Sequence, residues 1–339
     1  MIKKKGHILA IESSCDETAS AVVEYGGGFN IKSNIIASQI ELHKIFGGVV
    51  PEIASRKHIE CITQVTDEAL SAAGVTFSDI DAVAVTYTPG LVGALLVGVG
   101  YAKSLALALG KPLIAVNHIE GHICSNYISS PDLKPPFVCL VASGGHSSVV
   151  SVEDYTKFKV LASTRDDAPG EAFDKIARVL GLGYPGGPAI SEAAKAGNSD
   201  AYTFPRVSFD GSPDFSFSGV KTAVINLIHN FEQKGEEIPA ADIAASFQQA
   251  VCEVLAQRLI SCAKAAEVRN VALAGGVSSN TLLRSMAGNM AQVEGMGFHC
   301  PPPILCTDNA AMIAVRGFFD LERGIFAGSD LNAVASKGL

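Results

Sequence analysis

Residues 6–24 read GHILAIESSCDETASAVVE, and this stretch carries most of the information about the fold. Two apolar runs, at residues 7–11 and 19–23, flank a polar turn, which is the pattern of a β-hairpin. The same plan returns at residues 137–152, FVCLVASGGHSSVVSV. Two such hairpins, one opening each half, predict a duplicated α/β domain. We expect a ligand between the copies, since backbone N–H groups at small polar turns can approach phosphate oxygens.

The composition is that of a globular chain with more than one core. The chain has 339 residues, 48% of them hydrophobic, which is enough for two domains of ordinary size. Its eight cysteines are dispersed without a C-x-x-C pair, which favours a reducing compartment. The first apolar run stops at Glu12 and is too short for a signal peptide, so we expect a cytoplasmic protein. A formal net charge of −8 argues against a generally basic nucleic-acid binder.

Residues 91–110 are nearly all apolar and are about as long as a membrane-spanning helix. Lys103 falls in the second half of this segment, and Gly93, Gly98 and Gly100 weaken it as a spanning helix. No positively charged flank sets an orientation across a membrane. We therefore predict a fully buried helix of an α/β domain and no membrane contact.

Residues 51–73 are predicted to form a helix. Pro51 suits the first helical turn, apolar residues recur at three- and four-residue spacing, and a glycine follows as the stop. The first turns carry the cations Arg56 and Lys57 together with His58. Such a cluster is usually a solvated helix face, but in an acidic chain it is also the best local candidate for contacting a polyanion.

His118 and His122 follow a strand-like run at residues 112–116, where a buried element reaches the surface. Side chains four residues apart share one face of a helix at about 5–6 Å, so the pair could hold one metal ion. Two polar helix residues with satisfied hydrogen bonds are the alternative interpretation. The segment is not the H-E-x-x-H helix of zinc proteases, because Ile119 stands where that motif has Glu.

A third metal ligand would have to come from a distant part of the sequence. Asp308 is the best candidate, because it lies at the start of a predicted surface helix with Thr307 as its cap. We place Asp308 in the first turn of that helix. A carboxylate in this position also has a structural explanation, since it interacts favourably with the helix dipole.

Two glycine-rich loops in the second half are typical of nucleotide sites. Residues 275–280 (GGVSSN) follow a predicted strand, and glycine lets the backbone pass close to a base or a sugar. Asn280 also has a purely structural use as the N-cap of the next helix. The second loop, at residues 183–188, lies near Asp174 in the sequence. This carboxylate would suit a hydrogen bond to a ribose hydroxyl group, although a solvated aspartate on a helix is the alternative.

Taken together, motifs spread over the whole chain resemble those of one family. They are IESSCDET at 11–18, GGVVPE at 47–52 with ASRKH at 54–58, HIEGH at 118–122, SGGH at 143–146, FSFSGVKT at 215–222, AGGVSSN at 274–280 and TDNA at 307–310. In this order they resemble the TsaD family of tRNA N6-adenosine threonylcarbamoyltransferases. The resemblance implies an actin-like (ASKHA) α/β fold of two duplicated lobes with the active site in the cleft between them. It implies an N-terminal lobe at 1–132, completed by a C-terminal helix at 308–330, and a C-terminal lobe at 133–307.

The resemblance also implies roles for individual residues. His118, His122 and Asp308 match the family's iron ligands, and these ligand types would suit Zn(II) as well. The implied substrate-binding residues are Val141, Ala142, Ser143, Gly144, Gly145, Asp174, Gly187 and Asn280. Many relatives have Val or Ser near the position of Ala142, a departure that leaves the glycines of the turn intact.

The implied reaction moves a threonylcarbamoyl group from threonylcarbamoyl-adenylate to N6 of the adenosine at position 37, 3′ of the anticodon, in tRNAs that read codons beginning with A. N6-threonylcarbamoyladenosine (t6A) forms and AMP leaves. Adenine N6 is a poor nucleophile because its lone pair is delocalised, so an activated donor and one bound divalent metal fit this chemistry. Implied partners are tRNA, an inactive TsaB-like paralogue and a TsaE-like ATPase. Arg56 and Lys57 are the preferred tRNA contacts.

Some roles and functions remain open at this point. No side chain stands out as the general base; Glu12 or a metal-bound ligand could accept the proton. A small-molecule kinase of the same fold is the main alternative function. Such kinases usually carry an acidic residue near the second hairpin turn, where this chain has SGGH. A metalloprotease lacks its catalytic Glu here, and a nucleotide-binding scaffold would not need three convergent metal ligands.

Overall fold

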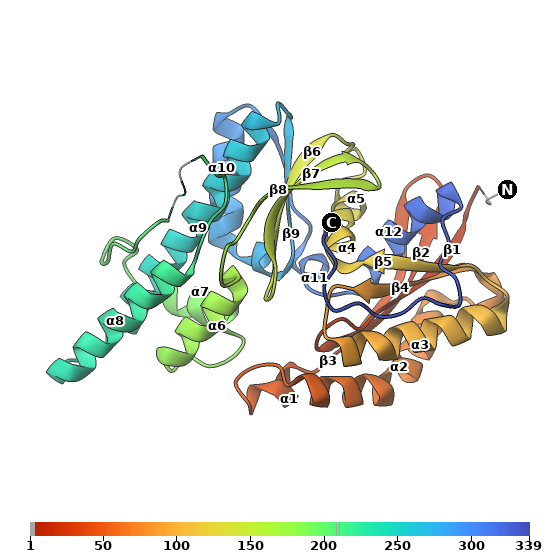
Figure 1. The fold of residues 1–339 in the computed structure, drawn as a ribbon, viewed down its shortest axis with the longest axis horizontal. Coiled ribbons are helices and arrows are strands. Elements are labelled where there is room, and N and C mark those ends of the chain that lie inside the picture. The colour runs from red at the N-terminus through yellow and green to blue at the C-terminus, as the bar shows by residue number, and fades with distance from the viewer. Residues whose placement is uncertain (1–3, 208, 210) are drawn as a thin grey trace. The chain divides into compact units, whose positions relative to one another are not determined.

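The computed structural model describes residues 4–207, 209 and 211–339. The chain forms two compact α/β units, which we call unit 1 (Met1–Leu133 and Pro301–Leu339) and unit 2 (Lys134–Cys300). In the described residues each unit contains one five-stranded sheet (Figure 1). The eight cysteines are all free thiols.

The two sheets have the same topology. The strand order is β3-β2-β1-β4-β5 in unit 1 and β8-β7-β6-β9-β10 in unit 2. In both, the first three strands form an antiparallel meander, and the last two strands continue the sheet in parallel beside the first strand. This repetition confirms the duplicated α/β fold that the two hairpins predict.

Unit 1 covers both faces of its sheet with helices. Its strands are β1 Gly6–Glu12, β2 Glu17–Tyr25, β3 Phe29–Ser38, β4 Ile80–Thr88 and β5 Leu113–Asn117. Its helices are α1 Ile40–Lys44, α2 Pro51–Ala73, η1 Phe77–Asp79, α3 Val92–Leu109, α4 His118–Cys124, α5 Asn126–Ser129, α11 Pro303–Cys306 and α12 Ala310–Arg323. Helices α2 and α3 pack on one face, whereas α12 lies across the other face with α4 beside it (Figure 1).

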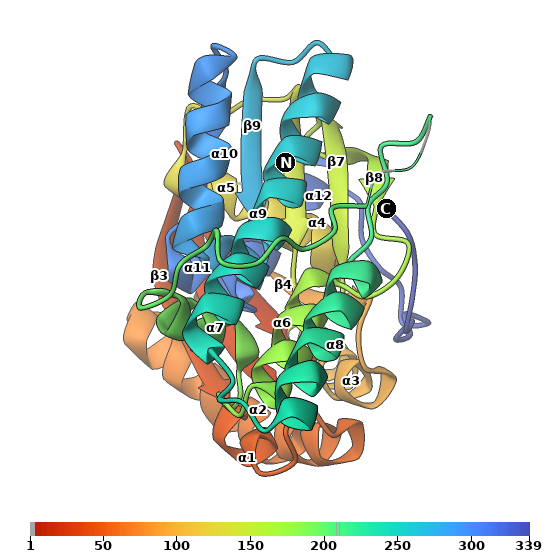
Figure 2. The ribbon, with the colours of Figure 1, turned by 90° about the vertical axis from the view of Figure 1, so that its left-hand side faces the viewer.

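Unit 2 packs its long helix α9 against the sheet, and α7 and α10 both contact that helix (Figure 2). Its strands are β6 Phe137–Ala142, β7 Ser147–Asp154, β8 Lys157–Ser163, β9 Asn270–Ala274 and β10 Gly297–His299. Its helices are α6 Pro169–Val179, α7 Gly186–Ala194, α8 Ser218–Lys234, α9 Ala240–Ala265, η2 Gly276–Ser279 and α10 Thr281–Val293.

Small residues allow the C-terminal helix of unit 1 to sit close to the sheet. The central strands β1 and β4 are buried along almost their whole length, with Ala10 and Ala84 fully buried. A Cβ at Gly317 of α12 would lie 2.9 Å from the Cβ of Ala84, so only glycine fits there without displacement. The last helix of the chain is therefore part of the core of unit 1.

The predicted helix at residues 51–73 is confirmed, and α2 ends at a left-handed Gly74. The prediction that the apolar segment 91–110 is fully buried is wrong. Helix α3 is long and apolar enough to cross a membrane by length and composition, but only 33% of it is buried. Its small residues and Leu95 pack against β4 and α2, while Leu96 and Leu107 are exposed. When a helix packs on a sheet, only one of its faces is buried. Because α3 is apolar on all of its faces, its sequence does not indicate which face that is.

Strands β3 and β8 were not predicted from the sequence. Both lie at the edge of a sheet, and most of their residues are partly or fully exposed. An edge strand contributes few residues to a core, so its apolar pattern is weak.

Candidate metal centre and substrate turns

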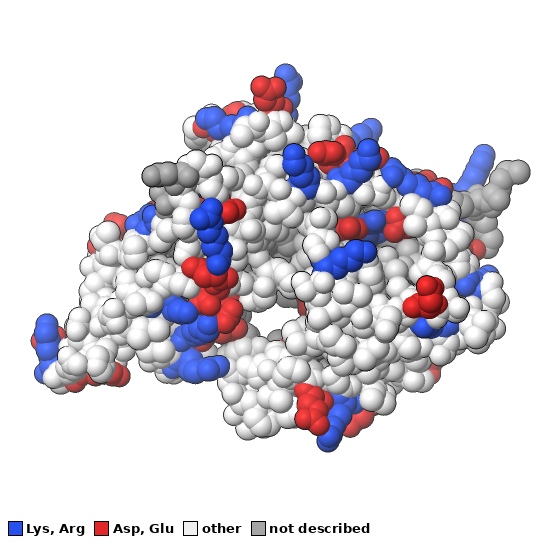
Figure 3. Space-filling model, viewed as in Figure 1, with Lys and Arg blue, Asp and Glu red and all other residues white. Residues whose placement is uncertain are grey.

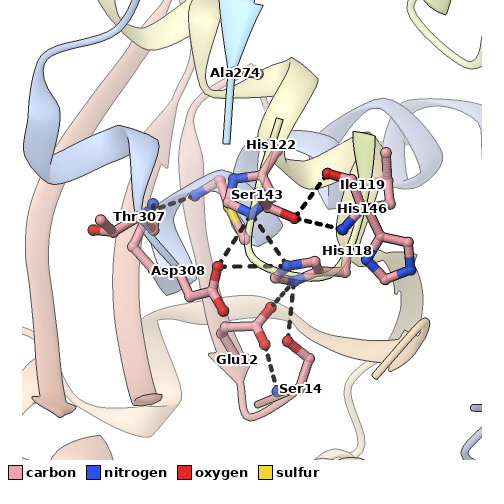
Figure 4. A network of polar contacts seen from close by, with 12 residues as sticks. Glu12, Ser14, His118, Ile119, His122, Ser143, His146, Ala274, Thr307 and Asp308 are labelled. Atoms are coloured by element: carbon pink, nitrogen blue, oxygen red, sulfur yellow. Dashed lines mark hydrogen bonds and ion pairs between the residues drawn. The ribbon is translucent and has the colours of Figure 1, made fainter. Parts of the chain in front are cut away.

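The two histidines lie in helix α4, which begins directly after strand β5, and both are buried. The last residue of β5, Asn117, caps α4 by accepting hydrogen bonds from the N–H groups of Ile119 and Glu120 at 2.9 and 3.4 Å. The cap fixes the start of the helix at His118 and places His122 one turn later on the same face. The two rings meet edge to face at 4.5 Å between centroids (Figure 4).

Asp308 reaches the same place from the segment between α11 and α12. The predicted cap at Thr307 is wrong: Asn309 is the N-cap of α12, and its side chain accepts from the N–H of Met312 at 3.0 Å. Asp308 therefore lies before the helix, not in its first turn. Because the capping role belongs to Asn309, the Asp308 carboxylate is available to the histidines.

The three side chains present their ligand atoms to one point. His122 Nε2 lies 3.1 Å from His118 Nε2 and 3.1 Å from Asp308 Oδ1, and His118 Nε2 lies 3.5 Å from that oxygen (Figure 4). Ligands about 2.1 Å from one metal ion are separated by about 3.0–3.4 Å along the edges of an octahedron or a tetrahedron. The observed triangle has the dimensions expected if two imidazoles and one carboxylate held a single divalent ion.

A second layer of contacts orients His118. Its Nδ1 lies 3.0 Å from Glu12 Oε2 and 3.2 Å from Ser14 Oγ. Glu12 is fully buried and also accepts hydrogen bonds from the Ser14 N–H at 2.6 Å and from the Thr86 hydroxyl at 2.5 Å. A carboxylate behind a histidine is the arrangement that fixes ring orientation at metal sites. His122 lacks such support, since its buried Nδ1 has no hydrogen-bond partner in the described chain.

These contacts bear on the suggestion that Glu12 is the general base. With its oxygens held by Ser14, Thr86 and His118, Glu12 faces the protein interior and has no exposed surface. Burial would raise the pKa of Glu12, but attraction to His118 and the hydrogen bonds with His118 and Ser14 together lower it. A weakly basic, enclosed carboxylate is better suited to orienting His118 than to accepting a substrate proton.

The electrostatics of the centre favour a cation. Burial alone would lower the pKa of His118, yet the nearby carboxylates of Asp308 and Glu12 raise it well above its ordinary value. Burial likewise opposes charge on Asp308, but His118 and His122 lower the pKa of this carboxyl strongly. The buried carboxylate of Glu12 and the partly buried carboxylate of Asp308 thus attract positive charge to the point where the imidazole nitrogens converge.

In unit 2, most of the predicted substrate residues surround one turn, residues 143–146, which we call turn 2. The side chains of Val141 and Ala142 are buried in β6, so only their backbone could meet a ligand. The Ser143 N–H is occupied by the His146 carbonyl at 2.8 Å. Gly144 and Gly145 are exposed, and their N–H groups have no acceptor in the described chain. They are therefore the groups of this turn that could donate to an anion.

Two glycines outside turn 2 pack closely against the turn and the strand before it. A Cβ at Gly170, in the first turn of α6, would lie 2.7 Å from both Gly144 Cα and Ser143 O. Gly275, at the end of β9, has φ +86° and leaves no room for a Cβ against Ala142.

Asp174 and Asn280 both have structural partners. Asp174, on α6, accepts a hydrogen bond from the Gly186 N–H at 2.6 Å, while a Cβ at the adjacent Gly187 would meet open space. Asn280 caps α10, and its amide donates to Ser191 Oγ at 3.1 Å and to Gln248 Oε1 at 2.9 Å. The N-cap interpretation of Asn280 therefore applies, whereas Asp174 is a partly buried acceptor and not a solvated aspartate. The substrate roles of both residues remain predictions.

The cationic cluster on α2 is less exposed and less free than the sequence suggests. Arg56 pairs with Glu52 at 2.8 Å and Lys57 with Glu60 at 2.9 Å. His58 is not part of the surface: it is fully buried, with its ring nitrogens 2.8 Å from Thr18 Oγ1 and 2.9 Å from the Cys15 carbonyl. On the face shown in Figure 3, Lys and Arg side chains are interspersed with Asp and Glu.

Two polar residues of the centre were missed by sequence reasoning. Ser14 lies in the quoted IESSCDET stretch, so the position of its turn after β1 could have indicated it. Thr86 gives no such indication, because a threonine inside an apolar strand is a common strand residue.

Comparisons with known proteins identify the family of the chain. The family model of TsaD, tRNA N6-adenosine threonylcarbamoyltransferase, matches residues 30–315. A protein of that name from Clostridium perfringens (strain SM101 / Type A) is 60% identical over 327 residues, covering 96% of each chain. One from Clostridium botulinum (strain Kyoto / Type A2) is 57% identical over 339 residues, covering 100% of this chain and 99% of its own.

A solved structure supports the fold. The crystal structure of T. kodakarensis HypF superimposes with a TM-score of 0.67 at 16% identity over 96% of this chain, which spans 49% of that protein. The predicted actin-like α/β fold is confirmed by this likeness and by the repeated sheet topology. The matches do not favour the kinase alternative. By its match to the family model and by its identity with these relatives over their full length, the chain belongs to the TsaD family of tRNA N6-adenosine threonylcarbamoyltransferases.

Proposed function

We propose that His118, His122 and Asp308 hold one divalent metal ion, Fe(II) in preference to Zn(II), for the threonylcarbamoyl transfer that forms t6A in tRNA. The family's reaction defines the acceptor as N6 of an adenosine in tRNA. The observation that carries the proposal is the triangle of two Nε2 atoms and one Oδ1 with sides of 3.1, 3.1 and 3.5 Å. Two histidines and one carboxylate are the ligand set of many Fe(II) sites, although ligand type does not exclude zinc.

The reaction is an acyl transfer from threonylcarbamoyl-adenylate. The bond between the carbamoyl carbon and the phosphate oxygen breaks, a bond from that carbon to N6 forms, AMP leaves, and N6 loses one proton. When bound, a metal with open positions polarises donor oxygens and offsets charge on the leaving phosphate. The chain's own contribution in unit 1 is to hold three ligands in place, with Glu12 and Ser14 fixing the ring of His118.

Turn 2 is proposed to bind the adenylate. The Gly144 and Gly145 N–H groups are suited to donate to phosphate oxygens, because they are exposed and have no acceptor in the described residues. Gly187, where a Cβ would meet open space, leaves room for the base or the sugar, and Asp174 and Asn280 would contact donor hydroxyl groups. The backbone of Val141, Ala142 and Ser143 completes the proposed substrate surface.

The tRNA substrate follows from the family, whereas further partners are part of the proposal. The net charge of −8 and the pairing of Arg56 and Lys57 with glutamates leave little free positive charge on α2. We therefore propose that a TsaB-like paralogue and a TsaE-like ATPase complete the tRNA-binding surface, and that the protein acts in the cytoplasm. Modification of position 37 in tRNAs for codons beginning with A belongs to the same proposal.

Metal analysis tests the centre directly. Protein purified without oxygen should contain about one Fe per chain, and His118→Ala and His122→Ala should lose both the metal and t6A formation, measured by nucleoside mass spectrometry. His229→Ala on the exposed face of α8 is a matched control that should change neither. Wild-type metal content in both variants at His118 and His122 would disprove the assignment.

A further inference from the structure

We infer that Glu120, Arg316 and Asp320 are positioning residues that set the geometry of the metal ligands by fixing α4 against α12. The inference rests on the proposed metal site. None of the three side chains contributes a ligand atom. They instead connect the helix that carries both histidines with the helix that begins directly after Asp308.

The contacts form a buried ionic network across the two helices. Arg316 Nε lies 2.5 Å from Glu120 Oε2, and Arg316 Nη1 lies 2.8 Å from Asp320 Oδ1, one turn along α12. The side chains of Arg316, Glu120 and Asp320 are 8%, 18% and 9% exposed. Glu120 stands between the two histidines in the sequence, so any shift of this contact moves both imidazoles.

Electrostatics of the network agree with an ionic contact. Burial would lower the pKa of Arg316, but attraction to Glu120 and Asp320 raises it above its ordinary value. Because the guanidinium keeps its proton and its Nε lies 2.5 Å from the carboxylate, we treat the contact as an ion pair.

A second observation shows that α4 has little freedom against α12. A Cβ at Gly121 would lie 2.7 Å from Ile313 Cδ1 and 3.4 Å from Met312 Cγ. The helices therefore touch through a glycine immediately beside the ion pair. Helix α4 has seven residues, too few for a stable isolated helix, so its orientation depends on these tertiary contacts.

A purely stabilising role is the competing explanation. Buried ion pairs often stabilise a fold no better than apolar residues of the same volume, but the planar fork of arginine fixes direction and register. The two explanations differ in what they predict for metal binding by a folded variant. Positioning predicts weaker metal binding and altered ligand geometry, whereas simple stabilisation predicts an altered melting temperature alone.

The test titrates metal-free protein with Co(II) against a competing chelator and records the visible spectrum of the bound ion. Arg316→Lys keeps the cation but not the fork, so we expect affinity for Co(II) to fall about tenfold or more, as for other residues behind metal ligands, with a changed spectrum. Arg323→Lys, in the last turn of the same helix, should retain wild-type affinity and spectrum.

A second variant keeps the test decisive if Arg316→Lys does not fold. Glu120→Gln, Arg316→Met and Asp320→Asn together leave none of the three charges, and this variant should fold but bind Co(II) more weakly. Wild-type affinity and spectrum in the folded variants, or a lower melting temperature alone, would overturn the positioning role. If the wild-type protein itself takes up no Co(II), the proposed metal site fails first, and the inference fails with it.

Discussion

The turns that follow β1 and β6 occupy the same position in two sheets of equal topology, yet they differ in burial. In turn 1, residues 13–16, Ser13 and Ser14 are buried, and the Ser13 hydroxyl donates to the Ala94 carbonyl of α3 at 3.0 Å. In turn 2, Gly144 and Gly145 are exposed, and a Cβ on either would meet nothing within 4 Å.

The difference comes from what covers each turn. In unit 1, the segment from Gly90 to Gly98 packs on turn 1 so closely that both glycines lack room for a Cβ, and the Leu91 N–H donates to the Ser14 carbonyl at 2.8 Å. Among the described residues, the start of α6 packs behind turn 2, where Gly170 lies against Ser143 and Gly144. A covered turn can orient a neighbouring side chain, as Ser14 does for His118, whereas an open turn keeps its N–H groups for a ligand. The two units therefore share one fold, but the turn after the first strand has a different role in each.

The largest expected effect comes from removing the carboxylate behind turn 1. Glu12→Ala leaves Ser14 N–H, the Thr86 hydroxyl and His118 Nδ1 without their buried acceptor. We expect the free energy of unfolding of the metal-free protein to fall by about 3–5 kcal/mol, the usual result of breaking a buried charged pair. Urea unfolding measures it. Gly144→Ala in turn 2 should cost less than about 0.5 kcal/mol, and equal effects would contradict the comparison.

A smaller effect is expected at the contact between turn 2 and Gly170 of α6. Gly170→Ala would place a Cβ 2.7 Å from backbone atoms of Ser143 and Gly144, so α6 or the turn must move. We expect a loss of about 1–3 kcal/mol in the free energy of unfolding together with weaker AMP binding by calorimetry. Gly187→Ala, where the Cβ meets open space, is the control for stability. Unchanged AMP affinity in Gly170→Ala would show that the shape of turn 2 is not needed for the nucleotide.

The buried His58, whose ring lies 2.9 Å from the Cys15 carbonyl of turn 1, should make the free energy of unfolding depend on pH. Burial lowers the pKa of this histidine, whose ring contacts Thr18 and the Cys15 carbonyl. Below about pH 6.5 the unfolded chain then binds more protons than the folded chain, so stability falls as the pH falls toward the folded pKa.

In the wild type, His58 should lower the free energy of unfolding by at most about 1.4 kcal/mol for each pH unit of acidification. The His58→Gln variant should lack this pH-dependent loss. Urea unfolding between pH 5 and pH 8 compares the two proteins. His229→Gln on the exposed part of α8 should keep the wild-type slope. If the free energy of unfolding depended on pH equally in the wild type and in His58→Gln, a neutral His58 would not be needed for the stability of the folded protein.

The smallest effect on stability is expected for the solvent-exposed charges of Arg56 and Lys57 on α2. Arg56→Glu with Lys57→Glu replaces two exposed cations in ion pairs with Glu52 and Glu60, so the unfolding midpoint should not change measurably. If both contact tRNA phosphates in the assembled complex, binding should weaken and the slope of log affinity against log salt should fall by about two. Metal content should stay unchanged. An unaltered salt slope would assign tRNA binding to other surfaces or partners.

Much of the fold could be predicted because its strongest patterns are local. The strands at 137–142 and 270–274 and the helix at 51–73 coincide with β6, β9 and α2, since apolar runs and a Pro start each act within a few residues. The exposed face of α3 and the edge strands β3 and β8 could not be predicted in the same way, because they depend on which neighbour is present.

The sequence by itself determined the duplicated hairpins, the spacing of His118 and His122 on one helical face, and the glycines of turn 2, because these follow from side-chain periodicity and backbone freedom. Only the tertiary structure decided that Asp308 completes the triangle from 186 residues beyond His122, that Asn309 rather than Thr307 caps α12, and that Glu12 lies behind His118. These outcomes depend on sheet order and helix docking, which bring distant segments together through packing that no local pattern encodes.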